Sequence, residues 1–438
     1  MHTHQNYKYN RLILMIGTFL EYFDLMLYVH MASILNELFF DPEVSWLMKY
    51  GSAISFCSTF FLKPIGGFVW GWVGDAYGRK KVLVYSLILM GLCSGIITLL
   101  PSYKEIGFSA FIVLTICRLF QGFASIGETN ASEIYIAENI TIPKRYFSTA
   151  LISYAGVIGT VISLFIVKLV LYFDLNWRFA FLFGTIILFL GLLIRLKFVE
   201  SNEFLQTKNK LKIFLDIDIK QENAKQQITN RGLTSILHTA TNRTKLAYFC
   251  VFCGWPISFY FSYVYCGNIL QKSFGFTKAM VVHQNLILGL FNLLGLFCWV
   301  YLTKFIHPLK ILKFKLSLYF PFIFALPYLL TIANSSSFLL LIQVLVILLG
   351  NSTVPARGVF IMSFGTLERF KWSAGLNGVS HVLLYIITSF GMDYMNNIIG
   401  VYGVLVIFLV ITIIYTWGIL EFIKIEKENG NYYVNFKK

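Results

Sequence analysis

The sequence predicts an all-α membrane protein, with twelve transmembrane helices in two six-helix bundles related by pseudo-symmetry. Three observations support this fold class. Of the 438 residues, 57% are hydrophobic and 13% are charged, whereas soluble domains carry roughly 25% charged residues. The apolar residues gather in runs of about 20, the length that a helix needs to cross a bilayer. Polar and apolar residues do not alternate within these runs, which excludes strands.

The apolar runs divide the chain into six spans, a polar stretch and six more spans. We predict spans at residues 12–35, 50–73, 82–100, 107–131, 147–172, 177–197, 246–269, 280–303, 311–332, 338–360, 374–395 and 401–422. The predicted domains are an N-terminal bundle, a cytoplasmic linker, a C-terminal bundle and a cytoplasmic tail, at residues 1–198, 199–245, 246–422 and 423–438. In membrane proteins built from two such repeats, the binding site lies between the halves near the bilayer midplane.

The positive charge is distributed unevenly along the chain. Most of the 36 Lys and Arg residues fall in segments on one side of the predicted spans, and the other side holds Lys49, Lys104, Arg178, Lys272 and Lys278. By the positive-inside rule, both termini lie in the cytoplasm. The net charge of +15 is therefore a topology signal, and it does not indicate a nucleic-acid partner. The first span lacks a small-residue cleavage site, so we expect a retained helix and not a signal peptide.

The turn between the second and third spans combines small residues, a carboxylate and basic residues, namely Gly71, Asp75, Gly78, Arg79 and Lys80. Glycines allow close backbone approach and unusual dihedral angles. The basic residues are costly in hydrocarbon and hold the turn on the cytoplasmic side. This run resembles the signature loop of the major facilitator superfamily, which points to solute transport.

Carboxylates inside a span are costly and are candidates for function. Glu21, Asp24 and Tyr28 share one face of the first span. Two carboxylates so close cannot both ionise cheaply, so one of them suits a proton carrier. The alternative is that they pair with Lys63 or Arg118 and only hold the first half together.

The fourth span carries a polar stripe. Arg118, Gln121, Ser125, Thr129 and Ser132 lie on one helical face, with Glu128 at its edge. A stripe headed by an arginine needs water or polar partners along its length, so we expect it to line a translocation cavity. Glu128 is a further candidate for proton transfer.

The second half offers fewer polar candidates. Asn377 and His381 share a face of the eleventh span, and this histidine is either a proton site or a packing residue. Tyr260 and Tyr263 in the seventh span could form part of a cage for a quaternary ammonium group. Arg357 lies near the inner end of the tenth span.

Other chemistry finds no support in the sequence. All seven cysteines fall inside predicted spans, and Cys250-x-x-Cys253 has no second pair or nearby histidine, so we expect no metal site. The turn at residues 71–81 lacks the pattern of a phosphate loop, and no hydrolase triad is present. We therefore expect neither an enzyme nor a cofactor.

Four further blocks narrow the resemblance to the metabolite:proton symporter family of the same superfamily. They are GTFLEYFDLMLY at 17–28, KPIGG at 63–67, QGFASIGE at 121–128 and VESNEF at 199–204. The resemblance implies a multi-pass protein of the bacterial inner membrane that works as a monomer. It implies symport of an organic solute with protons by alternating access, with Asp75 at a helix end near the second half and Arg79 as an ionic latch.

The chain departs from the family pattern at several positions. Ala76 stands where the family has a basic residue, and Lys63 replaces an arginine, which keeps the charge and loses the bidentate fork. The second copy of the turn, near residues 299–313, has Thr303 at the position of the carboxylate and lacks the glycines. We therefore expect the cytoplasmic latch to rest on Asp75 and Arg79 of the first half alone.

Three functions remain open at this point. The first is a proton-coupled symporter of a small zwitterion such as proline or betaine. The second is a carboxylate carrier of the 2-oxoglutarate or citrate type, which for a dianion needs at least two of Arg118, Lys63 and Arg357 in the cavity. The third is a transporter-like solute sensor that signals through its linker or tail.

Overall fold

The computed structural model describes residues 2–39, 57–196, 200–201, 204–206, 208–209 and 239–433. Within these ranges every regular element is a helix. Part of the predicted second span, 50–73, and most of the predicted linker, 199–245, lie outside the described residues.

Six membrane-spanning segments make up the first half. Residues 57–61 are helical and lead into the second segment. The helices of this half are α1 (His2–Phe39), α3 (Lys63–Tyr77), α4 (Arg79–Leu99), the short α5 (Tyr103–Ile106), α6 (Phe108–Asn139), α7 (Lys144–Tyr172) and α8 (Arg178–Leu196).

The second half has two interrupted segments. The seventh is α12 (Asn242–Phe252), α13 (Gly254–Tyr260), the π-helical η2 (Phe261–Tyr265) and α14 (Cys266–Phe274); the tenth is α17 (Ser336–Leu349), η3 (Val354–Ala356) and α18 (Arg357–Met362). The remaining elements are α15 (Lys278–Leu302), α16 (Pro308–Thr331), α19 (Arg369–Ile399), α20 (Tyr402–Glu428) and the short η4 (Asn431–Tyr433).

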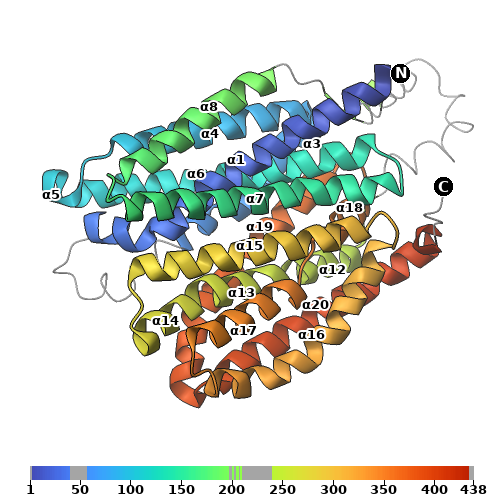
Figure 1. Cartoon of the computed structure of the whole chain (residues 1–438). Helices are drawn as coiled ribbons and strands as arrows, with labels where there is room; N and C mark the ends of the chain where they lie inside the picture. The colour runs from blue at the N-terminus through green and yellow to red at the C-terminus, as the bar shows by residue number, and fades with distance from the viewer. Residues whose placement is uncertain are drawn as a thin grey trace, which may run out of the picture.

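The predicted all-α membrane fold is confirmed. Ten stretches of the described chain are long and apolar enough to cross a membrane. α3 and α16 coincide with the two other predicted spans and complete the set of twelve. The helices of the first half lie on one side of the molecule and those of the second half on the other, and both chain ends emerge at the same end of the helices (Figure 1).

The two halves meet along two helix pairs, α3 with α19 and α7 with α15. The first pair packs through glycines on both helices. A side chain at Gly67 or Gly71 would overlap the backbone of Ala374 or Lys371, and one at Gly378 would overlap the backbone of Lys63. Small residues of this kind let membrane helices approach closely, because lipid supplies no hydrophobic force between them.

The ends of the fourth and sixth spans contain buried charged residues. The predicted fourth span ends at residue 131, but α6 continues to Asn139 and buries Glu133 and Glu138. Arg195, near the end of the predicted sixth span 177–197, lies in the last turn of α8 and is 1% exposed. Each of these charges has a partner of opposite sign, which removes most of the cost that hydropathy assigns to it.

Candidate functional site

A cavity of about 90 Å³ lies between the halves. Its walls come from α1, α3 and α7 of the first half and from the seventh, eighth, tenth and eleventh segments of the second. Aromatic side chains dominate one side, namely Tyr22, Phe60, Phe252, Trp255, Phe259, Tyr263 and Tyr385. This is the position between two bundles where such folds bind their solutes.

The charged groups on the cavity wall are positive. These charged groups are Lys63 and Arg357; His381 is a further ionisable side chain on the wall, and the lining that the structure describes contains no Asp or Glu. Arg357 donates from Nε to Oε1 of Glu133 at 2.9 Å. Lys63 lies 4.9 Å from the centroid of the Phe60 ring, and no described carboxylate is within ion-pair distance of it. On the cavity wall, Arg357 therefore has a carboxylate partner, and Lys63 has none among the described residues.

Asp24 belongs to a buried network behind the cavity. Its carboxylate accepts from Ser94 Oγ and from Gln121 Nε2 at 2.7 Å. Gln121 in turn accepts from Arg118 at 2.7 Å, and Arg118 stacks on the Tyr28 ring at 3.8 Å. The alternative that Asp24 pairs directly with Arg118 is therefore replaced by a link through Gln121.

The other two carboxylates have different partners. Thr129 Oγ1 donates to Glu21. Glu128 pairs with Arg195 and accepts from Ser86 at 3.3 Å. Since the Glu128–Arg195 pair is buried and lies wholly within the first half, it joins α6 to α8.

The structure brings only some of the predicted residues to the cavity. Lys63, Tyr263 and His381 are on its wall. The polar stripe of α6 is buried and faces away from it, since Arg118, Gln121 and Thr129 bond side chains of the first half and Ser125 bonds the carbonyl of Gly122. Contrary to expectation, no residue of the stripe lines this cavity, and Ser132 Oγ is buried without a hydrogen-bond partner among the described residues.

The second-half candidates are also mostly off the wall. Tyr260 is buried, with its hydroxyl 3.4 Å from the Ser389 carbonyl. Asn377 is 2% exposed, and its carbonyl lies 2.8 Å from Nδ1 of His381. Of the two tyrosines proposed for a cage, only Tyr263 reaches the cavity.

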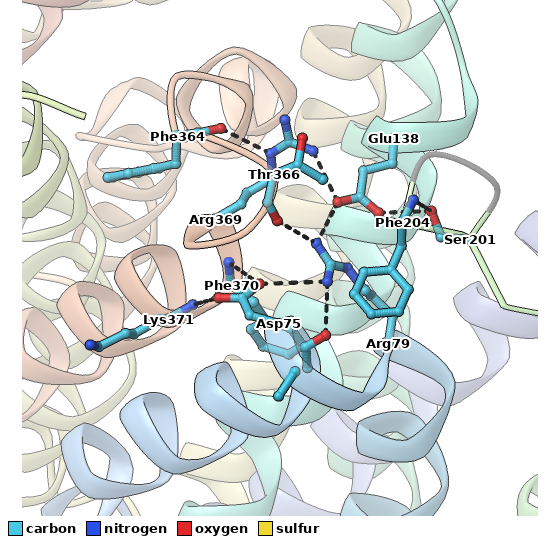
Figure 2. A network of polar contacts seen from close by, with 12 residues as sticks. Asp75, Arg79, Glu138, Ser201, Phe204, Phe364, Thr366, Arg369, Phe370 and Lys371 are labelled. Carbon is cyan, nitrogen blue, oxygen red and sulfur yellow. Dashed lines mark hydrogen bonds and ion pairs between the residues drawn. The ribbon is translucent and has the colours of Figure 1, made fainter. Parts of the chain in front are cut away.

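At one end of the molecule, the turn motif closes the gap between the halves. Backbone N–H groups of Phe370 and Lys371, in the first turn of α19, donate to Asp75 at 3.2 and 2.9 Å. Asp75 thus occupies the N-terminus of a second-half helix, where the helix dipole favours a negative charge. Figure 2 shows this contact beside the side chain of Arg79.

Arg79 is fully buried at the centre of the same network. It donates to the Gly74 carbonyl at 2.8 Å, to Glu138 at 2.7 Å and to the carbonyl of Thr366, in the second half, at 3.1 Å. It also lies 3.5 Å from Asp75. The arginine therefore holds the two halves together at this end.

The expectation that the latch rests on the first half alone is wrong. Arg369 of the second half donates to Glu138 at 2.9 Å, so this carboxylate is shared by two arginines from opposite halves (Figure 2). Glu200 accepts from the backbone N–H groups of Arg79 and Lys80, both at 3.0 Å. We call Asp75, Arg79, Glu138, Glu200 and Arg369 the gate network.

The second-half copy of the turn makes a different contact. Thr303 donates to the carbonyl of Val300 in its own half. Lys304 lies 4.2 Å from the centroid of the Phe147 ring, and the His307 ring lies 5.2 Å from that of Tyr146. In the second-half turn, Lys304 and His307 therefore contact aromatic side chains at the start of α7, whereas the first-half turn uses the carboxylate of Asp75.

Sequence reasoning missed two functional candidates, Glu133 and Arg195. Glu133 lies beyond the predicted end of the fourth span at residue 131, because a hydropathy window ends where charges begin. Arg195 lies within the predicted sixth span but close to its end, among the charges assigned to the cytoplasm. Glu133 follows Thr129 by one helical turn, and this spacing could have indicated that it lies on the same helical face as the polar stripe.

The fold and the site define a class of protein. Twelve membrane-spanning segments in two halves, with a cavity between the halves and a buried polar network that links them at one end, are the architecture of a solute transporter. The chain belongs to the Major Facilitator Superfamily, whose family model matches residues 14–369. It is therefore a multi-pass membrane transporter and not an enzyme.

Three curated relatives match about half of this chain or less, and the chain spans about half of their length or less. The chain is 32% identical over 206 residues to "Proline/betaine transporter" of Escherichia coli (strain K12), covering 45% of this chain and 41% of the relative. It is 33% identical over 223 residues to "Putative metabolite transport protein" of Haemophilus influenzae, with 48% and 49% covered. It is 32% identical over 197 residues to "Putative proline/betaine transporter" of Staphylococcus aureus (strain COL), covering 43% of this chain and 42% of the relative.

Solved structures agree on the fold. The proton:xylose symporter XylE bound to 6-bromo-6-deoxy-D-glucose superposes with a TM-score of 0.74 at 16% identity, covering 96% of both chains. The transporter FucP in its outward conformation superposes with a TM-score of 0.64 at 14% identity, covering 93% of this chain and 98% of its own.

Proposed function

We propose that this protein is a secondary active transporter that carries a small organic solute together with protons by alternating access. The observation that carries the proposal is the cavity between the halves, together with buried carboxylates in the first half and the gate network at one end. Proline and glycine betaine are the first candidate solutes, because relatives carry the name proline/betaine transporter. Glu21, Asp24, Glu128 and His381 are the candidates for the proton.

We further propose the topology and the domain limits. The gate network lies at the end where both chain termini emerge (Figure 1), which is the cytoplasmic end by the positive-inside rule. The location is the bacterial inner membrane, and the halves comprise residues 1–198 and 246–422, joined by the linker 199–245.

Uptake of labelled solute into proteoliposomes tests the function. We expect accumulation of proline or glycine betaine when the outside is acidic, and only equilibration when no pH gradient is imposed. The control is the same vesicles made permeable to protons by an uncoupler. Failure to accumulate proline, glycine betaine or 2-oxoglutarate under a gradient would count against symport and in favour of a solute sensor.

A second candidate, a carrier of carboxylates, is favoured by one observation. Lys63 and Arg357 both line the cavity, which meets the requirement of two cations for a dianion. An aromatic wall and two cations suit a solute with carboxylate ends and an apolar body.

Replacing Lys63 with glutamine tests the second candidate, the carrier of carboxylates. For a dicarboxylate carrier, we expect KM for 2-oxoglutarate to rise roughly tenfold or more, because a hydrogen bond to a charged group is worth about 1.5–3 kcal/mol. Lys104→Gln, an exposed lysine on α5, is the matched control and should leave KM unchanged. An equal effect of the two substitutions would remove Lys63 from the solute site.

A further inference from the structure

We propose that the Glu133–Arg357 pair couples the proton to the solute: Glu133 takes the transported proton, and Arg357 then binds a carboxylate of the solute. This inference rests on the proposed symport function and names a chemical group that its substrate must carry.

The first argument is the geometry of the pair. Glu133 is fully buried on α6 of the first half, and Arg357 is 6% exposed at the start of α18 of the second half. Arg357 Nε and Ser153 Oγ donate to the same oxygen, Oε1 of Glu133, at 2.9 and 2.7 Å. The other oxygen, Oε2, is buried and has no hydrogen-bond partner among the described residues. A buried carboxylate with one unsatisfied oxygen is costly, and a proton on that oxygen removes the charge.

The second argument is access to the solute. Arg357 and Ser153 both line the central cavity, so a carboxylate in the cavity can replace Glu133 as the partner of the guanidinium. The charges balance: one proton neutralises Glu133, Arg357 stays positive, and one solute carboxylate takes the place of the lost anion. After the solute leaves, Arg357 pairs with Glu133 again, and the proton departs.

The third argument is the position of the pair in the transport cycle. Because Glu133 and Arg357 belong to opposite halves, opening the gate end must separate them. Breaking a buried pair without compensation is strongly unfavourable, because each charge is left in a low-dielectric interior without its partner. The empty transporter therefore stays closed at this end, protonation of Glu133 releases that restraint, and the solute carboxylate then takes the place of Glu133 beside Arg357.

Other titratable groups surround the pair. Tyr22 of α1 and Tyr248 of α12 lie within electrostatic range of both partners, Glu21 lies within range of Glu133, and Lys63 and His381 lie within range of Arg357. The other buried glutamates of α6 are held differently, Glu128 by an arginine of its own half and Glu138 by two arginines of the gate network. Of these three glutamates, only Glu133 has a partner on the cavity wall.

A measurement without solute tests the lock. Hydrogen exchange is measured on the full chain in lipid nanodiscs. The amides of Phe370 and Lys371, in the first turn of α19, donate to Asp75, so their exchange rate reports opening of the gate end. After correction for the intrinsic pH dependence of exchange, we expect these amides to exchange faster as the pH falls. Glu133→Gln should exchange rapidly at every pH. The double variant Glu133→Gln with Arg357→Gln leaves no unpaired charge, so it is the second test if the single variant does not fold. Wild-type pH dependence in either folded variant would overturn the proposal.

A transport measurement tests the coupling. Labelled proline, glycine betaine and 2-oxoglutarate are offered to proteoliposomes with a pH-sensitive dye inside. In the double variant, we expect loss of gradient-driven accumulation and of solute-dependent proton entry, together with weaker solute binding because Arg357 is removed. A wild-type proton-to-solute ratio in this variant would overturn the role of the pair, and loss of that ratio in Asp24→Asn alone would assign the proton to Asp24. If the wild type carries none of the three solutes, the proposed function fails, and the hydrogen-exchange result still decides the lock.

Discussion

Glu138→Gln is expected to destabilise the protein by about 3–5 kcal/mol, the typical cost of breaking a buried ion pair. The Glu138 carboxylate accepts from Arg79 at 2.7 Å and from Arg369 at 2.9 Å. Both arginines are buried, so a neutral glutamine leaves two positive charges close together and removes the carboxylate that they share, while Asp75 stays 3.5 Å from Arg79. We expect a lower apparent melting temperature in detergent, together with faster hydrogen exchange at the start of α19 because the gate network loses its centre.

The matched control is Glu37→Gln at the opposite end of the molecule. Glu37 also pairs across the two halves, with Lys278, but its side chain is 65% exposed. Exposed ion pairs contribute about 0–1 kcal/mol, so this variant should melt close to the wild type. Equal melting temperatures for the two variants would show that the gate network does not stabilise the closed state.

Gly71→Ala is expected to abolish solute uptake while the protein still inserts and folds. A methyl group at this position would overlap the backbone of Lys371, so α3 and α19 must separate at the gate end. Asp75 would then lose the amides of Phe370 and Lys371, and the transporter could not close on that side. Labelled uptake into proteoliposomes measures the loss.

Gly91→Ala is the control for helix chemistry. The added methyl group there lies 3.8 Å from Cβ of Leu188, which is an ordinary van der Waals contact. Alanine has the better helix propensity, so we expect normal uptake. Full activity of Gly71→Ala would mean that the close approach of these two helices is not needed for closure.

Hydropathy and the turn motif predicted much of the architecture. A run of about 20 apolar residues has few alternatives to a membrane helix, because the backbone must satisfy its hydrogen bonds internally. The position of Asp75 at a helix end of the second half also followed from the resemblance, and the structure places it at the first turn of α19.

Pairings between distant residues could not be predicted in the same way. Glu128 meets Arg195 across 67 positions, and Glu133 meets Arg357 across 224. No periodicity within one helix carries that information. The hydropathy window also ended the fourth span before Glu133 and the sixth span close to Arg195, because it counts each charge as though it had no partner.

The sequence by itself determined that this chain spans a membrane as two sets of six helices, and that residues 71–81 form the turn between the second and third of them. Only the tertiary structure decided which charges face the cavity and which are satisfied within one half. The physical reason is that the cost of a buried charge depends on its partner, and partners on different helices are chosen by packing. For this reason the stripe headed by Arg118 is buried within the first half, whereas Lys63 and Arg357 reach the cavity wall.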